Sequence, residues 1–369
     1  MTTEPQLSVR GITKRFGSAF ELSATDLTVG DDEIVALLGP SGCGKTTILR
    51  CIAGVETPDS GSVEIGGRVV DSPEISAPPE ERNVGMVYQN YAIWPHKTVY
   101  ENVVFPLEHA SHGIPESEYD ERVAEMLELM EIPELADKPA TDLSGGQQQR
   151  TALARALVYE PDLLLMDEPL SNLDRELRKQ MRYELQRLQH ELSVSILYVT
   201  HDQEEAFYLA DRVIILHEGR VVERGSPEEL YESPKSAFTR RFIGARNPFN
   251  GRIEVDGSGG RILTTDFLDV ELTSTNYMSN GEGPGEVSCF LRPEDVSICE
   301  NGDSPGRVAL QGTVVAEGIL GDRYEVTVGF DDTDTELTVH CGEYRNLSRG
   351  DRLDLRVDPA AIQVYRNET

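Results

Sequence analysis

A nine-residue loop between an apolar run and a helical segment constrains this chain more than any other feature. Gly39–Thr47 reads GPSGCGKTT; it follows the run Ile34–Leu38, expected to form a buried strand, and precedes a helix expected over Ile48–Ala53. Its glycines let the backbone curl so that successive N–H groups point inward, and the helix adds the positive end of its dipole. In this context the pattern G-x-x-x-x-G-K-[ST] predicts a phosphate cradle. Its expected nucleotide-binding residues are Gly39, Pro40, Ser41, Gly42, Cys43, Gly44, Lys45, Thr46 and Thr47.

Four side chains near this loop are expected to serve the phosphates, a metal ion and the attacking water. Lys45 is expected to reach the β- and γ-phosphates, and Thr46 to hold Mg²⁺ through its hydroxyl. The apolar segment Asp162–Glu168 shows no alternation, which indicates a central parallel strand covered on both faces. The carboxyl end of such a strand lies at the ligand crevice of the sheet, where Asp167 would hold Mg²⁺ through the water shell of the metal. Glu168 would polarise the water that attacks the γ-phosphorus.

Polar residues also end two further strands at the same edge of the sheet. Gln89 follows the expected strand Val84–Tyr88, and His201 follows Val194–Thr200. Gln89 is expected to ligate Mg²⁺ or to order the attacking water, with an ordinary polar loop residue as the alternative. For His201, a contact to the γ-phosphate is favoured over a structural role. Phe16 lies in a turn between the first two strands, where it either stacks on an adenine ring or packs in a core.

Residues 91–150 change from strand to helical patterning and are expected to form a helical insert. The window Tyr119–Met130 has an apolar face at helical spacing. The insert ends in Leu143–Arg150, LSGGQQQR, before a helix expected over Thr151–Val158. This second glycine-bearing loop at a helix N-terminus is again suited to binding an anion. Because one nucleotide has no use for two distant phosphate-binding loops on one subunit, the two loops favour two nucleotides between two subunits.

The remainder of the chain divides into a helix–strand region and a strand-rich tail. A strongly amphipathic helix follows Ser171–Asp174. Beyond residue 245, short strand-like segments between Gly, Asp and Asn turns predict a small all-β barrel or a pair of barrels. We therefore expect a nucleotide-binding domain over residues 1–245 and a regulatory or binding domain over residues 246–369. The apolar stripe of the amphipathic helix is expected to comprise Met181, Leu185, Leu188 and Leu192.

Composition limits what the chain binds and where it works. With 34 basic and 65 acidic residues, the net charge is −31, and such an acidic excess opposes nucleic-acid binding. We hypothesise a halophilic cytoplasm, where salt screens self-repulsion; an ordinary acidic mesophilic protein is the alternative. No apolar run approaches the ~20 residues needed to cross a bilayer, and the first residues lack a secretory signal, so the chain is expected to stay in the cytosol. Five scattered cysteines without a C-x-x-C pair argue against a disulfide framework and against a zinc site.

The order of these motifs resembles that of the ATPase subunits of ABC transporters over roughly residues 7–245. The residues that carry this resemblance are Gly39–Thr46, Gln89, Leu143–Gln147, Asp167, Glu168, Asp174 and His201. In the tail, Gly225–Tyr231, Phe242–Gly244 and Leu291–Glu294 resemble the importer group that carries a C-terminal OB-fold (TOBE) domain. The resemblance implies an α/β P-loop NTPase core, RecA-like, with a mostly parallel sheet, an antiparallel β subdomain and a helical insert. A small all-β OB-fold domain would follow this core, and the activity would be ATP hydrolysis.

The resemblance also implies that two ATPase subunits, a homodimer or a pair with a paralogue, bind two MgATP head to tail. In such a pair Phe16 would stack on the adenine, and Asp174 would cross the dimer interface. The catalytic residues would be Glu168, His201, Lys45 and Gln89, and the metal ligands would be Thr46, Gln89 and Asp167. The second subunit would complete each site with Ser144, Gly145, Gly146 and Gln147.

The partners implied by the resemblance are two transmembrane permease subunits, linked to the nucleotide through Gln89, and an extracellular solute-binding protein. The chain would be peripheral at the cytoplasmic face of the cell membrane, and ATP hydrolysis would drive solute import. Asn90–His96 is similar to the carbohydrate-importing members, so a carbohydrate is favoured, with polyamines, ferric iron and oxyanions as alternatives. A soluble ABC ATPase acting on DNA or ribosomes is disfavoured because the sequence shows no long coiled coil, second nucleotide unit or basic surface. Asp167, Glu168 and His201 disfavour a nucleotide switch without turnover.

Overall fold

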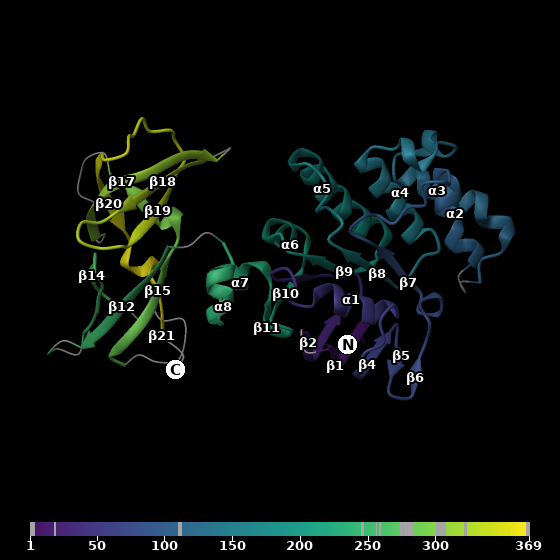
Figure 1. Ribbon diagram of the computed structural model, residues 1–369, viewed down its shortest axis with the longest axis horizontal. Coiled ribbons are helices and arrows are strands. Elements are labelled where there is room, and N and C mark those ends of the chain that lie inside the picture. The colour runs from purple at the N-terminus through teal and green to yellow at the C-terminus, as the bar shows by residue number, and fades with distance from the viewer. Residues whose placement is uncertain are drawn as a thin grey trace. The chain divides into compact units, whose positions relative to one another are not determined.

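In the computed structural model, the chain forms two compact units (Figure 1). The structure describes residues 4–17, 20–109, 113–244, 247–255, 257, 260–273, 276, 283–299, 308–320 and 323–366. By its contacts the chain divides into residues 1–230 and residues 231–369. Helix α8 (Ala237–Phe242) packs within the second unit, where the Arg240 guanidinium carbon lies 3.5 Å from the ring centroid of Tyr365. The domain boundary expected after residue 245 stays a prediction.

A mostly parallel six-stranded sheet forms the centre of the first unit. Its order is β11-β10-β3-β9-β8-β7, and all neighbours are parallel except β10 and β11. Strands β3, β8 and β9 are buried along their whole length, as predicted for central strands covered on both faces. The carboxyl ends of the parallel strands therefore meet at one edge of the sheet. The strands are β3 (Ile34–Leu38), β7 (Val84–Val87), β8 (Leu163–Asp167), β9 (Ser195–Thr200), β10 (Arg212–His217) and β11 (Arg220–Gly225).

An antiparallel sheet of five strands forms a second layer of this unit. Its order is β2-β1-β4-β5-β6. Between β4 and β5, Gly66 and Gly67 have φ angles of 54° and 73°, in the left-handed region that glycine adopts without steric cost. They form the tight turn of the β4–β5 hairpin, in which Ile65 pairs with Arg68. The strands are β1 (Leu7–Phe16), β2 (Phe20–Val29), β4 (Ser60–Ile65), β5 (Arg68–Ser72) and β6 (Ile75–Ser76).

Helices surround the parallel sheet and fill the insert, whose helices α2, α3 and α4 lie together at one end of the first unit (Figure 1). The α-helices of residues 1–230 and the short helix that crosses the division are α1 (Lys45–Ala53), α2 (Val99–His109), α3 (Tyr119–Leu129), α4 (Gly145–Leu157), α5 (Arg175–Leu192), α6 (Gln203–Leu209) and α7 (Pro227–Glu232). Single 3₁₀ turns occur at Pro79–Glu81, Glu116–Glu118, Pro133–Leu135, Ala140–Asp142, Pro293–Asp295 and Pro359–Ala361.

Three details of the helices differ from the prediction. Helix α1 begins at Lys45, three residues before the expected start at Ile48. Helix α4 begins at Gly145 and not at Thr151, because a side-chain cap from Ser144 stabilises an earlier start. In α5, Met181, Leu185 and Leu188 are buried as expected. Leu192, assigned to the same apolar stripe, is 37% exposed because it is the last residue of the helix, where the chain turns through a left-handed Ser193 (φ 49°).

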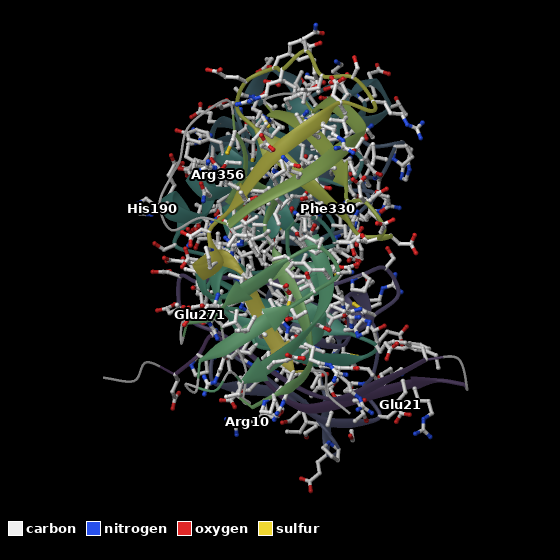
Figure 2. The ribbon with its side chains drawn as sticks, turned by 90° about the vertical axis from the view of Figure 1, so that its left-hand side faces the viewer. Arg10, Glu21, His190, Glu271, Phe330 and Arg356 are labelled. Carbon is white, nitrogen blue, oxygen red and sulfur yellow. The ribbon has the colours of Figure 1, made fainter. Side chains whose placement is uncertain are left out.

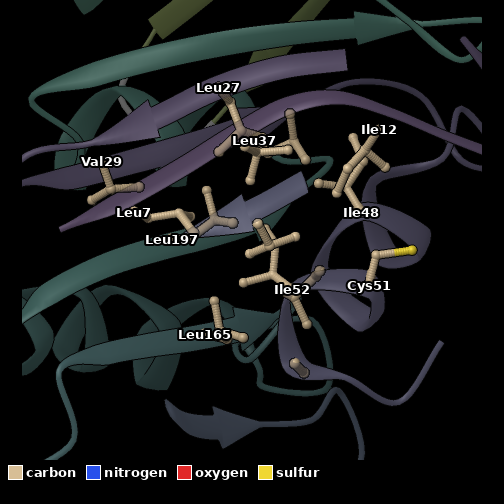
Figure 3. Packing of buried hydrophobic residues seen from close by; sticks show 14 of the residues in the cluster. Leu7, Ile12, Leu27, Val29, Leu37, Ile48, Cys51, Ile52, Leu165 and Leu197 are labelled. Carbon is tan, nitrogen blue, oxygen red and sulfur yellow. The ribbon is translucent and has the colours of Figure 1, made fainter. Parts of the chain in front are cut away.

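The core of the first unit joins its two sheets through α1 (Figure 3). Leu7, Ile12, Leu27 and Val29 of the antiparallel sheet face Leu37, Leu165 and Leu197 of the parallel sheet, with Ile48, Cys51 and Ile52 of α1 packed against them. Burying each such Leu or Ile side chain contributes roughly 1.5–3 kcal/mol. The packing fixes α1, and with it the loop that precedes it, at the carboxyl end of β3.

The second unit is built from two antiparallel sheets around one apolar core, in agreement with the predicted all-β OB-fold domain. The orders are β14-β13-β12-β15-β21 and β16-β20-β17-β18-β19. Its strands are β12 (Asn247–Val255), β13 (Arg261–Thr264), β14 (Asp269–Glu271), β15 (Gly285–Leu291), β16 (Val296–Ile298), β17 (Val308–Leu320), β18 (Arg323–Gly329), β19 (Glu336–Cys341), β20 (Arg352–Val357) and β21 (Gln363–Arg366).

Acidic side chains such as Glu21 and Glu271 are exposed on outer strands, and oxygen-tipped side chains project outward from the ribbon (Figure 2). The halophile hypothesis based on this charge stays a prediction. All five cysteines are free. Among the described residues, none of the helices has the length and the apolar character to cross a membrane.

Candidate functional site

The loop Gly39–Thr47 joins β3 to α1, and two of its glycines are required by the backbone around them. A Cβ atom on Gly39 would lie 2.2 Å from the carbonyl oxygen of Leu216, and one on Gly44 would lie 2.7 Å from Cζ of Phe20. Gly44 also has φ 108°, a conformation that L side chains rarely adopt. As the N-cap of α1, Gly44 provides no side-chain cap to the first N–H groups of the helix. The loop thus leaves backbone donors at the positive end of a helix dipole.

The Lys45 side chain is folded beneath this loop. It is 4% exposed, and its Nζ donates to the carbonyl oxygens of Gly39 at 2.8 Å and Pro40 at 3.0 Å. The same Nζ lies 4.0 Å from Oε1 of Glu168. A buried ammonium held by carbonyl oxygens and a carboxylate is a positive charge available to a phosphate that enters the loop.

Thr46 and Asp167 bring two hard oxygen ligands together. The Thr46 hydroxyl donates to Oδ1 of Asp167 at 2.9 Å. Asp167 is 7% exposed, and burial raises the pKa of its carboxyl group, while the hydrogen bond from Thr46 opposes that rise. A hydroxyl and a buried carboxylate in contact suit Mg²⁺, which prefers oxygen ligands and keeps part of its water shell.

Glu168 is the centre of the polar contacts at the sheet edge. Its Oε2 lies 3.0 Å from Nδ1 of His201 and accepts a hydrogen bond from Nε2 of Gln89 at 3.3 Å. With the nearby Nζ of Lys45, all four residues expected to be catalytic meet at one carboxylate. Glu168 has φ 47°, an uncommon value for a residue with a side chain, and its N–H donates to the carbonyl oxygen of Val199 at 2.9 Å. The left-handed turn directs the chain away from β8 directly after Asp167.

A cavity of about 470 Å³ opens beside these groups. Phe16 stands at it with 42% of its surface exposed and is therefore not a core residue; the alternative of core packing is wrong. Gly39, Pro40, Cys43, Asp167 and His201 are not among the described residues that line the cavity. Cys43 is buried, and burial raises the pKa of its thiol. The lining residues are Phe16, Phe20, Ser41, Gly42, Gly44, Lys45, Thr46, Thr47, Gln89 and Glu168.

The second glycine-bearing loop lies elsewhere in this chain. Ser144 caps α4, accepting a hydrogen bond from the Gln147 N–H at 3.4 Å, while Gln147 Oε1 accepts from the Ser144 N–H at 3.0 Å. Neither these two residues nor Gly145 and Gly146 belong to the described lining of the cavity. Asp174 caps α5 through a 3.0 Å bond from the Leu177 N–H and does not line the cavity either.

Two polar residues at the site, Ser171 and Asn172, were not predicted. The Ser171 hydroxyl accepts from Gln89 Nε2 at 3.3 Å, and Asn172 Nδ2 donates to the backbone oxygen of Gln89 at 2.8 Å. The only signal in the sequence was their position three and four residues after Glu168. Phe20, which faces Gly44 from β2, was also missed because its strand alternation indicates only an ordinary β residue.

Comparison with known proteins identifies the family to which this site belongs. A family model described as ABC transporter matches residues 22–171, and one described as TOBE domain matches residues 289–364. The spermidine/putrescine import ATP-binding protein PotA of Aggregatibacter actinomycetemcomitans is 40% identical, over 89% of this chain and 86% of that protein. The Fe(3+) ions import ATP-binding protein FbpC of Vibrio cholerae is 39% identical, over 92% of each chain.

Solved structures support the same assignment for the nucleotide-binding core. CbiO1 from Clostridium perfringens, part of an ABC transporter complex, aligns with TM-score 0.55 and 30% identity, over 62% of this chain and 91% of that one. MJ0796, described as a bacterial ABC transporter cassette in dimeric form, aligns with TM-score 0.52 and 31% identity, over 60% of this chain and 98% of that one. The chain therefore belongs to the ABC transporter family, with the P-loop ATPase fold. Within that family it is an ATP-binding subunit of the importer type with a TOBE domain, and it is an ATPase.

Proposed function

We propose that this chain hydrolyses MgATP at the cavity beside Gly39–Thr47, as one half of a dimer that drives solute import. The observation that carries the proposal is the convergence on Glu168, whose carboxylate lies within 3.0–4.0 Å of His201, Gln89 and Lys45. The contact between Thr46 and Asp167 adds a metal site next to it. Positioning and charge stabilisation supply most of the catalysis of phosphoryl transfer, and these residues are suited to both.

Each group has a separate role in this mechanism. Lys45 and the loop N–H groups neutralise the phosphate oxygens, while Phe16 stacks on the adenine. Glu168 accepts the proton of the attacking water, and His201 contacts the γ-phosphate. Thr46, Asp167 and Gln89 would hold Mg²⁺, which contributes charge stabilisation at the transferred phosphoryl group when bound.

A second ATPase subunit would complete the site. The capped loop Ser144–Gln147 and the α5 cap Asp174 are exposed or half-buried, apart from a buried Gly146, and none of them is among the described residues that line the cavity. In a head-to-tail dimer, formed with a second copy of this chain or with a paralogue, they would reach the nucleotide held by the other chain. Hydrolysis would then depend on closure of the dimer, which links chemistry to the membrane partners.

A groove in the first unit supports docking of a membrane permease subunit. A hollow of about 540 Å³ is lined by apolar and aromatic side chains that include Met86, Trp94 and Phe105. It is bordered by Arg155, whose guanidinium carbon lies 4.8 Å from the Trp94 ring centroid and whose Nη1 donates to the carbonyl of Ala92 at 2.7 Å. Strand β7 lines this groove and leads directly to Gln89 in the nucleotide cavity. We propose a short helix of a transmembrane permease subunit as its occupant, which would place the chain at the cytoplasmic face of the membrane.

For the solute, we propose a polyamine first and ferric iron second. The relatives named above are importers of spermidine/putrescine and of Fe(3+) ions, which supports these two classes. They give no support to the carbohydrate favoured on Asn90–His96. The TOBE domain and the importer relatives favour the role of an importer subunit over that of a soluble ABC ATPase without a transport partner. An extracellular solute-binding protein would deliver the solute.

The test is hydrolysis by the purified chain, followed by transport by the assembled complex. MgATP should be hydrolysed by the wild type and by Lys179→Ala, an exposed control on α5. Lys45→Ala should lose at least about 100-fold, because it removes the main cation of the site. In vesicles that contain the permease and binding protein encoded with this chain, ATP-dependent uptake of putrescine is expected; uptake of maltose alone would contradict the proposed solute.

A further inference from the structure

A second cavity of about 470 Å³ lies at the edge of the parallel sheet opposite to the nucleotide site. Asp162, directly before β8, and Ser195, the first residue of β9, line it, so it is found at the amino ends of these strands. The insert contributes residues of α3 and the last residue of α4, and the core contributes the end of α5. The volume falls within the ~300–1,000 Å³ that is typical of small-molecule sites. None of the described lining residues has a role in the hydrolysis proposed above.

One part of the lining of this second cavity is apolar. Leu192, the member of the α5 stripe that stays 37% exposed, lines it together with Met126 and Leu129 of α3 and Leu157 of α4. A concave apolar surface is favourably covered by the apolar part of a ligand, because that contact removes both surfaces from water. The cavity is therefore suited to a ligand with an aliphatic segment.

The polar part of the lining is negatively charged. The carboxylates of Asp31, Glu160 and Asp162 line the cavity, and Arg122 is the only basic residue among the described lining residues. Nη1 of Arg122 already donates to Oε1 of Glu160 at 2.7 Å. Within the described part of the chain, the carboxylates of Asp31 and Asp162 have neither an ion pair nor a hydrogen bond. The lining thus carries uncompensated negative charge and is suited to a cation.

The distribution of these carboxylates favours an extended organic cation over a metal ion. Asp31 precedes β3, whereas Glu160 and Asp162 precede β8. Across the described ranges, no group of three or more His, Cys, Asp or Glu side chains is placed to hold a metal ion. A compact cation needs several oxygen ligands gathered around it and would leave the apolar surface uncovered. An ammonium group donates three hydrogen bonds, and the methylene groups of an alkyl chain cover apolar surface.

We propose that this second cavity binds an aliphatic diamine, with its methylene chain against Leu192 and the insert and its ammonium groups at Asp31 and Asp162. The proposal goes beyond the hydrolysis proposed above, and it rests on the lining of the cavity and not on the proposed solute. Because the lining belongs to both the insert and the core, the bound diamine holds the end of α4 against the parallel sheet. The other end of α4 carries the loop Ser144–Gln147.

Isothermal titration of the full chain with 1,6-diaminohexane tests the proposal, at constant ionic strength and without nucleotide. One diamine should bind per chain, and the melting temperature should rise with diamine concentration, as expected for a ligand of the folded state. Neither 1,6-hexanediol, which lacks the charges, nor MgCl₂, which lacks the chain, should displace it. Displacement by MgCl₂ at equal ionic strength, binding of many diamines per chain, or no binding would overturn the proposal.

Three variants with a matched control separate this cavity from attraction to the acidic surface as a whole. Asp162→Asn and Asp31→Asn should each weaken binding about 3- to 10-fold, the scale of one charge-assisted hydrogen bond at a partly exposed position. Leu192→Ser should weaken it about 2- to 5-fold by removing apolar contact. Glu74→Gln removes the same charge from an exposed turn between β5 and β6 and should bind the diamine as the wild type does.

Equal affinities in Glu74→Gln, Asp162→Asn and Asp31→Asn would show attraction to net charge only and would overturn the proposal. Wild-type affinity in Leu192→Ser would remove the aliphatic contact, and with it the choice of a diamine. Because each of these measurements is made on the chain without nucleotide, failure of the diamine site would leave the proposed hydrolysis untouched. Loss of hydrolysis in Lys45→Ala tests that proposal separately.

Discussion

The N-termini of α1 and α4 follow similar glycine-bearing loops, yet they are prepared for binding in opposite ways. At α1 the N-cap is Gly44, which provides no side-chain acceptor, and a cavity opens beside the first turn. At α4 the N-cap Ser144 and Gln147 satisfy each other's N–H groups in a capping box. The first helix leaves its donors open to a ligand, whereas the second has closed part of its own.

This difference distinguishes the two halves of the proposed site. The half around α1 is assembled within this chain, and the half around α4 is not. Around α1, residues from four strand ends converge within hydrogen-bonding or ion-pair distance, although they are far apart in the sequence. Around α4, Ser144 and Gln147 bond to each other, and a Cβ on Gly145 or Gly146 would lie 3.6 Å from Leu173 or 3.3 Å from Leu177 of the same chain. Under the dimer proposal, the motif at α4 takes part in hydrolysis only when it approaches a nucleotide held by another chain.

The largest expected effect belongs to the assembled half. Glu168→Gln removes the proton acceptor and preserves the shape of the side chain, so hydrolysis should fall about 10²- to 10⁴-fold while nucleotide binding is kept. The measurement is single-turnover hydrolysis together with binding of a fluorescent ATP analogue. Glu125→Gln, an exposed position on α3, is the control and should keep the wild-type rate. Unchanged turnover in Glu168→Gln would make the convergence on this carboxylate irrelevant to the chemistry.

The second-largest effect is expected at the loop before α4, and it tests whether this loop acts on the nucleotide of another chain. Ser144→Asp keeps a good N-cap but places a negative charge where a phosphate is expected, so hydrolysis should fall about 100-fold with little change in melting temperature. Mixed with Lys45→Ala, it should regain activity. A mixed dimer of two-fold type then contains one intact site, so about a quarter of all sites are restored at random pairing.

The mixing experiment would show no recovery of activity if both loops acted on a nucleotide bound to the same chain. Lys45→Ala chains would then stay inactive whatever partner is added, and the mixture would show only the residual rates of its components. Two wild-type halves contributed by different chains can assemble only across an interface. Recovery in the mixture therefore distinguishes a shared site from a weak site within one chain.

The α1 half could be predicted from sequence because its parts obey local rules. Gly39–Thr47 contains its glycines, lysine and threonine within nine residues, and Asp167 and Glu168 directly follow an apolar strand. Parallel strands end at one sheet edge, so Gln89 and His201 could be assigned to the same region without any coordinates. The observed contacts of Glu168 agree with that expectation.

The features that could not be predicted depend on backbone conformations that the residue types do not indicate. The left-handed turn at Glu168 has no glycine, and the Asn172–Gln89 bond joins residues 83 positions apart. At α4, the low helix propensity of Gly145 and Gly146 concealed an early helix start that the capping box stabilises. Both misses arise where a few specific hydrogen bonds override the average preference of the residues involved.

The smallest expected effect concerns the charge of the buried Asp167 carboxylate beside α1. Burial raises the pKa of Asp167 above its unfolded value. Between those two pKa values the native state binds more protons than the unfolded state, so the free energy of unfolding falls as pH rises through that window. At neutral pH, Asp167→Asn should therefore be modestly more stable than the wild type, because it keeps the Oδ1 acceptor for Thr46 and removes the buried charge.

This stability difference should shrink as the pH is lowered through the window, because the wild-type carboxyl then becomes protonated and resembles the amide. Urea unfolding in Mg²⁺-free buffer at a series of pH values measures it. Asp174→Asn is the matched control, since asparagine caps α5 as well as aspartate does and this carboxylate is exposed. If Asp167→Asn were instead less stable than the wild type at neutral pH, the charge of the Asp167 carboxylate would stabilise the fold through Thr46 and Lys45. The α1 half would then be stabilised by the same charge that is proposed to bind the metal ion.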